Sequence, residues 1–321
     1  MALSNRAGPG AFRLRPRSRA IAPDPDICAV MNAGSGRGRK GARAAEFEAH
    51  LADRPRWTLR VVRRGAALAE AAERAVAEGF STVVAAGGDG TVNAVASQVA
   101  GGDSRLGVAP LGTFNFFARS LGLPQEIGAA LDAAEARETR SVPVGEVNGR
   151  VFLNNASLGA YPAILQRRER IYGTVGRSRA AAAASVLATL AGRRGSVIGR
   201  LKADGARRPL RTPLAFVALN AFQLEHYGLD GVDCLRRGRL ALFLATRRDR
   251  LGLMKSAADL AFGRPVRGRD FELVCAERLV IESRRPRRVV ALDGERATLN
   301  GPFRFRLRND ALRVAVPEDA A

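Results

Sequence analysis

Two glycine-rich turns lie close together between residues 85 and 119, and they constrain the fold of this chain more than any other feature. The first is Gly87-Gly88-Asp89-Gly90-Thr91, and the second is Pro110-Leu111-Gly112-Thr113. Each turn follows a short apolar run and precedes a segment with apolar residues at helical spacing. This order is typical of a parallel α/β sheet whose strand ends bind phosphate.

The first turn joins an apolar, β-branched run at 81–86 to a predicted helix over 92–99, with Thr91 as the expected cap. Glycine allows the backbone to approach a ligand closely, and the positive end of a helix suits phosphate. A lone carboxylate would repel phosphate, so we expect Asp89 to face a metal ion or a hydroxyl group. The alternative is an ordinary strand–helix turn in which Asp89 is a cap.

The second turn follows a predicted strand at 106–109, and there Thr113 and Asn115 offer a hydroxyl and an amide to a ligand. We expect the aromatic residues at 116 and 117 to pack in the core. A third glycine-rich segment, at 32–41, follows a predicted first strand at 27–31. It lacks the spacing of a Walker A loop, and alone it could be merely flexible and basic.

The pattern of predicted secondary structure changes near residue 141. Residues 25–140 alternate strands and helices, which predicts a doubly wound α/β domain. Residues 141–311 contain many short strands, which predicts a β-sandwich domain interrupted by helices at 179–190 and 251–262. Strands are expected at 141–147, 150–156, 197–203, 212–220, 240–246, 269–275, 278–282, 288–292, 298–299, 303–307 and, beyond the sandwich, 312–316. Residues 1–24 have the composition of a disordered basic tail, although a transit peptide would look similar.

The formal charge of +21 is extreme for 321 residues, and it comes almost entirely from arginine. Such a charge favours anionic membranes or nucleic acid as partners, although genome composition also produces arginine bias. No RNA-binding aromatic motif, zinc finger or helix-turn-helix is visible, and aromatic residues make up only 6%. We therefore expect no specific nucleic-acid partner.

The three cysteines, Cys28, Cys234 and Cys275, are scattered and form no CxxC motif. This spacing argues against a disulfide scaffold or a zinc site and fits a reducing cytosol. The longest uncharged run, 180–192, is too short to span a bilayer. An apolar helical face at 251–262 could lie on a membrane, but packing against the sandwich is the commoner explanation.

Six segments resemble motifs of the diacylglycerol kinase catalytic-domain superfamily of lipid kinases, nearest to its branch with a GTLNHFAR-like second motif. The resemblance implies an N-terminal domain related to NAD kinase and phosphofructokinase, and a C-terminal β-sandwich. It also implies that ATP binds between them and that residues 312–321 return to the first domain. The segments are NAGSG (32–36), GGDGTVN (87–93), PLGTFNFFARSLGLP (110–124), VGEVNGRVFLNNASLG (144–159), LDGE (292–295) and ALRVAVP (311–317).

The resemblance implies an ATP-dependent lipid kinase that transfers the γ-phosphoryl group of Mg²⁺–ATP to a lipid hydroxyl, such as that of diacylglycerol or a sphingoid base. By this resemblance, Glu295 corresponds to the general base, and Asp89 would bind the magnesium ion. Asp293 would shape its turn or assist the metal, and the division of work between Asp89 and Glu295 stays open. The expected nucleotide contacts are Asn32, Gly34, Ser35, Gly36, Arg63, Gly87, Gly88, Asp89, Gly90, Thr91, Val92, Asn93, Gly112, Thr113 and Asn115.

Several positions depart from the superfamily pattern. Phe116 replaces a common aspartate of the second motif, and Arg63 lies where a threonine often contacts nucleotide. Arg236 and Arg237 stand where bacterial members often carry carboxylates for a structural magnesium ion, so that metal site is in doubt.

Two alternatives remain: an NAD kinase-like enzyme, which shares GGDGT, and a regulatory or nucleic-acid-binding protein that lost catalysis on the same fold. Taken alone, Asp293-Gly294 is also an ordinary hairpin signal. We expect a cytoplasmic protein that associates peripherally with an anionic membrane surface, where its lipid substrate lies. The identity of the lipid and the existence of a homodimer are left open.

Overall fold

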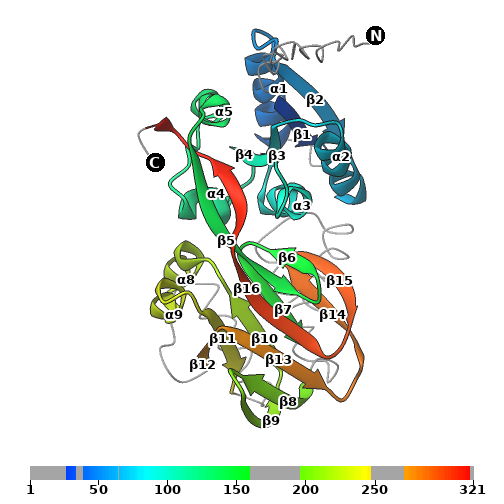
Figure 1. The fold of residues 1–321 in the computed structure, drawn as a ribbon, viewed down its shortest axis with the longest axis vertical. Helices are drawn as coiled ribbons and strands as arrows, with labels where there is room; N and C mark the ends of the chain where they lie inside the picture. Colours follow the sequence, from blue (N-terminus) through cyan, green and yellow to red (C-terminus); the bar gives the residue numbers. More distant parts are fainter. Residues whose placement is uncertain (1–26, 34–38, 64, 160–195, 247–270, 319–321) are drawn as a thin grey trace, which may run out of the picture.

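The computed structural model describes residues 27–33, 39–63, 65–159, 196–246 and 271–318, which form two β-sheets with helices packed on them (Figure 1). The larger sheet has ten strands and the smaller has six. Within these ranges, no helix is long and apolar enough to cross a bilayer.

The N-terminal region is a doubly wound parallel sheet with the strand order β2-β1-β3-β4. Helices α2 and α3 pack on one face, and α1 and α5 pack on the other. Both glycine turns therefore lie at the carboxyl ends of neighbouring strands. The elements are β1 (Ile27–Asn32), α1 (Arg39–Leu51), β2 (Trp57–Val62), α2 (Gly65–Ala77), β3 (Thr82–Gly87), α3 (Asp89–Val99), β4 (Arg105–Pro110), α4 (Phe116–Ser120) and α5 (Ile127–Glu135).

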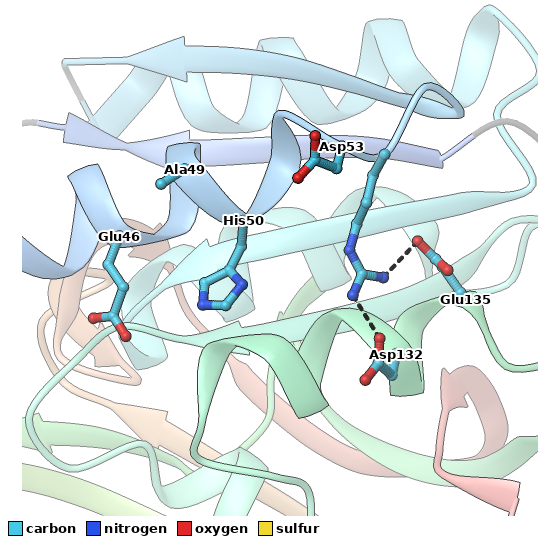
Figure 2. A pocket seen from close by; sticks show the side chains of 7 residues that line it. Glu46, Ala49, His50, Asp53, Asp132 and Glu135 are labelled. Atoms are coloured by element: carbon cyan, nitrogen blue, oxygen red, sulfur yellow. Dashed lines mark hydrogen bonds and ion pairs between the residues drawn. The ribbon is translucent and has the colours of Figure 1, made fainter.

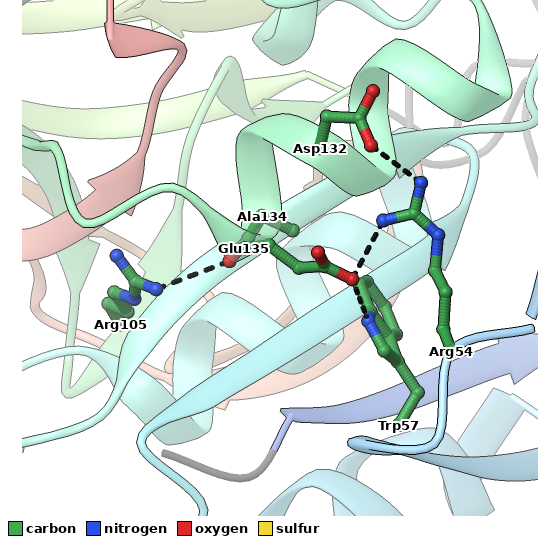
Figure 3. Close-up of polar contacts among 6 residues, drawn as sticks. All are labelled: Arg54, Trp57, Arg105, Asp132, Ala134 and Glu135. Carbon is green, nitrogen blue, oxygen red and sulfur yellow. Dashed lines mark hydrogen bonds and ion pairs between the residues drawn. The ribbon is translucent and has the colours of Figure 1, made fainter. Parts of the chain in front are cut away.

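A polar cluster fastens α5 to the amino-terminal edge of this sheet (Figure 3). Arg54, just before β2, forms ion pairs with Asp132 at 2.5 Å and with Glu135 at 2.7 Å. The indole Nε1 of Trp57 donates a hydrogen bond to Glu135 Oε1 at 2.5 Å. Arg105 of β4 donates to the carbonyl oxygen of Ala134 at 3.3 Å. The end of α5 is thus held by β2 and β4 together.

The long strand β16 (Phe303–Ala315) joins the two regions of the molecule. Its first half pairs with β13 (Arg278–Ser283), and much of its length pairs with β5 (Thr139–Val147). Near its end, Val314 pairs in parallel with Leu106 of β4. The ten-stranded sheet also includes β6 (Arg150–Phe152), β8 (Val197–Ala203) and β9 (Ala206–Thr212).

The second sheet is antiparallel throughout and has the order β12-β11-β10-β7-β14-β15. Its inner face packs against β8, β13 and β16 around a core that includes Phe152, Leu158 and Phe305. The expected pairing of an α/β domain with an all-β sandwich is confirmed. The remaining elements are β7 (Asn155–Gly159), β10 (Leu214–Ala218), α8 (Ala221–His226), α9 (Val232–Arg236), β11 (Leu240–Ala245), β12 (Phe271–Ala276), β14 (Arg287–Leu292) and β15 (Glu295–Asn300).

Several local expectations were wrong. The strand predicted at 150–156 is two strands, because the backbone at 153–155 turns to bind Asp293. The strands predicted at 303–307 and 312–316 are one strand, β16, with a register shift between Arg308 and Leu312. Strand β9 and the short helices α8 and α9 were not predicted. The predicted helices at 179–190 and 251–262 lie outside the described residues.

The expectation about the cysteines was also wrong, because Cys234 and Cys275 form a disulfide with their Cα atoms 5.4 Å apart. Cys234 lies on α9 and Cys275 on β12, and both elements pack against β11. A separation of 41 residues carries no local signal for this pairing. Cys28 is buried in β1, and burial raises the pKa of its thiol to about 11.

Gly107 on β4 lies where the parallel sheet packs closely against α5. A Cβ built there would lie 2.7 Å from Cγ2 of Val84 and 3.1 Å from Cβ of Ala134. We expect Gly107→Ala to lower the free energy of unfolding by about 1–3 kcal/mol in urea denaturation, because overpacking forces its neighbours to move. The control is Gly65→Ala on α2, where a Cβ meets nothing within 4 Å. Equal stability of the two variants would contradict this account of β4.

Candidate active site at the carboxyl ends of β3 and β4

The two glycine turns touch each other directly. A Cβ built on Gly112 would lie 2.5 Å from the Cα of Gly88, so neither residue has room for a larger neighbour. The amide of Leu111 donates to the carbonyl oxygen of Gly87 at 2.9 Å. Because both residues lack side chains, two stretches of partly exposed backbone lie side by side at the carboxyl edge of the sheet.

Helix α3 begins at Asp89, with Gly88 as its N-cap and no side chain capping it. The prediction that Thr91 caps this helix was wrong. Thr91 is buried against Gly87, and its hydroxyl oxygen accepts a hydrogen bond from Asn32 Nδ2 at 3.5 Å. The first-turn N–H groups of an uncapped helix are free to bind an anion.

Asp89 is held on one side only. Its Oδ1 accepts hydrogen bonds from the backbone N–H of Phe117 at 3.1 Å and from Nδ2 of Asn154 at 3.4 Å. No hydrogen bond to Oδ2 is recorded among the described residues. Asp89 therefore has one oxygen fixed by the second motif and the sandwich, and the other available to a cation.

Asp293 is held on both sides. Its Oδ2 accepts a hydrogen bond from the backbone N–H of Leu153 at 2.7 Å, and its Oδ1 accepts from those of Asn154 and Asn155 at 2.8 Å each. The pKa of Asp293 is raised to about 7. Removal from water is the largest cause, and the charge of Asp89 acts in the same direction, while the three N–H groups oppose the shift. Both oxygens of Asp293 are thus occupied in fixing the segment that carries Asn154.

Glu295 lies beside the first turn of α3, although it comes from the far end of the chain. It is the first residue of β15 and is exposed. A Cβ built on Gly90 would lie 3.1 Å from its Oε1. The fold therefore brings Glu295 to the same helix end as Asp89.

A chain of buried amides, which the sequence analysis missed, supports Asp89 from the sandwich. Oδ1 of Asn154 accepts a hydrogen bond from Nδ2 of Asn220 at 2.7 Å, and the same Nδ2 donates to the carbonyl oxygen of Phe116 at 3.1 Å. Asn155 donates to Oε1 of Gln223 at 2.9 Å. The adjacent asparagines at 154 and 155 were within a recognised motif, but their partners at 220 and 223 had no signal in the sequence.

The other predicted nucleotide contacts have different surroundings. Thr113 and Arg63 are exposed. Val92 packs in the core, and its N–H donates to the carbonyl oxygen of Gly88. Gly34, Ser35 and Gly36 lie outside the described residues.

Two asparagines predicted to contact nucleotide are buried. Nδ2 of Asn115 donates to the carbonyl oxygens of Pro110 and Gly112, both at 3.2 Å, and its φ of 52° is left-handed. Asn115 therefore shapes the second turn from within, and its contact with nucleotide stays a prediction. Asn93 is also buried, and its Oδ1 has no hydrogen-bond partner within the part of the chain that the structure describes.

A pocket between α1 and α5 does not belong to this site (Figure 2). Its lining is largely acidic and includes Glu46, Asp53 and Asp132, which disfavours phosphate. Asp53 and Arg54 precede β2, so the pocket opens near the amino ends of the strands, opposite the glycine turns. Within the described ranges, no three His, Cys, Asp or Glu side chains are grouped to hold a metal ion.

The raised pKa of Asp293 makes stability depend on pH. Between pH 3.8 and about pH 7, Asp293 in the folded chain holds a proton that the unfolded chain has released. The free energy of unfolding therefore falls as the pH rises through this range, and it levels off above about pH 7. We expect Asp293→Asn to remove this part of the slope in urea unfolding from pH 5 to 8, whatever constant offset the lost bond adds. Asp103→Asn, at an exposed carboxylate, is the control. Parallel slopes for wild type and Asp293→Asn would refute the assignment.

Comparisons with known proteins agree with this arrangement. The "Probable lipid kinase YegS-like" of Pseudomonas aeruginosa is 43% identical over 124 residues, which are 37% of this chain and 39% of that protein. A "Diacylglycerol kinase" of Staphylococcus aureus is 43% identical over 90 residues, 27% of this chain and 29% of that protein. The chain thus aligns with less than half the length of these curated relatives.

Two solved structures share the fold at low identity. A diacylglycerol kinase from Bacillus anthracis superposes with a TM-score of 0.62 at 18% identity, covering 92% of this chain and 98% of that one. Yeast NADH kinase complexed with NADH gives 0.51 at 11% identity, covering 92% and 84%. The sequence pattern of the "Diacylglycerol kinase catalytic domain" matches residues 26–147. These residues belong to the diacylglycerol kinase catalytic-domain superfamily.

Proposed function

We propose that this protein is an ATP-dependent kinase that phosphorylates the hydroxyl group of a lipid such as diacylglycerol or a sphingoid base. One observation carries the proposal: Asp89 and Glu295 both lie at the uncapped end of α3, where the two glycine turns touch. Phosphoryl transfer needs a phosphate cradle, a divalent cation and an oriented hydroxyl group. The residues at this helix end match those three needs.

The residues present fit Mg²⁺–ATP. Bare backbone at Gly88 and Gly112 suits close approach by phosphate, and the first turn of α3 offers N–H donors. Magnesium usually takes one or two carboxylates and completes its shell with phosphate oxygens and water. Asp89 with its unengaged Oδ2 meets that requirement, and the bound ion would neutralise charge on the transferred phosphoryl group.

Glu295 is the proposed general base. Its carboxylate takes the proton of the lipid hydroxyl as that oxygen forms a bond to the γ-phosphorus and the bond to the β–γ bridging oxygen breaks. ADP and a lipid phosphate are the products. Asp293 holds the turn that carries Glu295, and Asn154 orients Asp89, so both act as positioning residues rather than on the substrate.

Gly88→Val tests the phosphate cradle. A Cβ on Gly88 already comes within 3.3 Å of the Cα of Gly112, and the valine methyl groups would occupy the space proposed for phosphate. We expect Mg²⁺–ATP binding to be lost in titration calorimetry while the circular dichroism spectrum is kept. Gly65→Val on α2 is the control. A folded Gly88→Val protein with wild-type ATP affinity would place the nucleotide elsewhere.

Glu295→Gln and Asp89→Asn should separate the two acidic roles. With Glu295→Gln we expect unchanged Mg²⁺–ATP affinity and a loss of about 10²–10⁴-fold in turnover of lipid alcohols, as removal of a general base typically gives. Asp89→Asn should also weaken the Mg²⁺-dependent part of nucleotide binding.

The assay uses labelled ATP with a panel of diacylglycerol, sphingoid base, ceramide and NAD. If Glu295→Gln turns over at the wild-type rate, Glu295 is not the general base, and Asp89 becomes the leading candidate. Phosphorylation of NAD alone would replace the lipid kinase with an NAD kinase-like enzyme.

A further inference from the structure

The outward face of the sandwich strands β9, β8, β13 and β16 carries a continuous array of cations. Along these strands, side chains that face the core alternate with basic ones: Leu201, Leu279, Phe303 and Phe305 are at most 1% exposed. The basic side chains at the outward positions define what we call the basic face: Arg200, Lys202, Arg207, Arg211, Arg278, Arg304, Arg306 and Arg308.

The strand register places these cations next to one another. Lys202 lies opposite Arg207 on one side and Val280 on the other, and Val280 lies opposite Arg304. Arg278 lies opposite Arg306. Neighbouring strands are about 4.8 Å apart, so the array crosses four strands over a width of about 15 Å.

Two carboxylates on this face, Glu282 and Glu146, leave most of its charge unbalanced. Glu282 binds Lys202 and lies 3.4 Å from Arg200, and these cations together with Arg207 lower its pKa. Glu146 accepts two hydrogen bonds from Arg306, each of 3.0 Å. Among the described residues, no ion pair is recorded for Arg207, Arg211, Arg278 or Arg304.

We propose that the basic face docks the protein on the anionic surface of a lipid bilayer. The proposal rests on the proposed function, since a lipid kinase must reach a substrate held in a membrane. Guanidinium groups bind phosphate in a two-pronged geometry, and an open sheet face matches a planar surface. The uncharged outward positions, Ile198, Pro209 and Val280, include no aromatic ring, whereas single-stranded nucleic acid is usually bound by stacking on aromatics.

The test compares two triple variants of the full chain with the same loss of charge. One is Arg207→Gln, Arg278→Gln and Arg304→Gln on the basic face. The matched control is Arg74→Gln, Arg137→Gln and Arg237→Gln, at exposed positions elsewhere. Binding is measured without ATP by co-sedimentation with phosphatidylcholine vesicles. The vesicles are prepared with and without about 30 mol% phosphatidylglycerol, which gives them a negative surface charge.

We expect the wild type and the control to bind the anionic vesicles, less as salt rises. The basic-face variant should lose on the order of 100-fold in partitioning, since each basic side chain near such a surface contributes about 1 kcal/mol. Equal loss in both variants, or none in the basic-face variant, would overturn the proposal. Binding of the wild-type protein to duplex DNA but not to the anionic vesicles would also overturn the proposal. ATP affinity, measured in parallel, reports on the kinase site separately, so failure of docking and failure of the proposed function are distinguishable.

Discussion

The three hydrogen bonds that Asp293 accepts from consecutive backbone N–H groups organise the proposed active site. They tie the turn between β14 and β15 to the segment between β6 and β7. The turn carries Glu295, and the segment carries Asn154, which reaches Asp89. Removing a carboxylate from water is costly unless it is well hydrogen-bonded, and the three N–H groups offset part of that cost here. The resulting arrangement fixes two other acidic side chains at one helix end.

This anchor depends on the sandwich and the parallel sheet being held in a definite relation. The amide of Asn220 connects the start of α8 to the carbonyl oxygen of Phe116, at the start of α4. The ring of Phe116 is surrounded by Phe114, Phe222, His226 and Tyr227, with centroids 5.3–6.4 Å away. Where the superfamily commonly has an aspartate, this chain has an aromatic contact that packs the second glycine turn against the sandwich.

The sequence predicted those parts of the fold that depend on local chemistry. The glycine turns, the alternation of strand and helix up to residue 140 and the DGE turn all have short-range signals, and they located Asp89, Gly88, Gly112 and Glu295. It did not predict the interactions between distant segments. The Asn154–Asn220 pair spans 66 residues and the Cys234–Cys275 disulfide spans 41, and nothing near either residue indicates its partner. Asn115 and Val92 lie in recognised motifs, but only the packing shows that they face inward.

The position of β16 has a consequence for how the chain acquires its structure during synthesis. Val314 closes the side of the parallel sheet beyond β4, and Leu312, Val314 and Val316 fill the same core as α2 and α3. The N-terminal region therefore lacks part of its core, and one neighbour for β4, until about residue 316 has left the ribosome. Until then the unpaired side of β4 resembles an exposed edge strand, which invites association with other chains. The two glycine turns of this region are complete by residue 115. The region then waits for roughly two hundred more residues, at ~5–20 residues per second, before its last strand is synthesised.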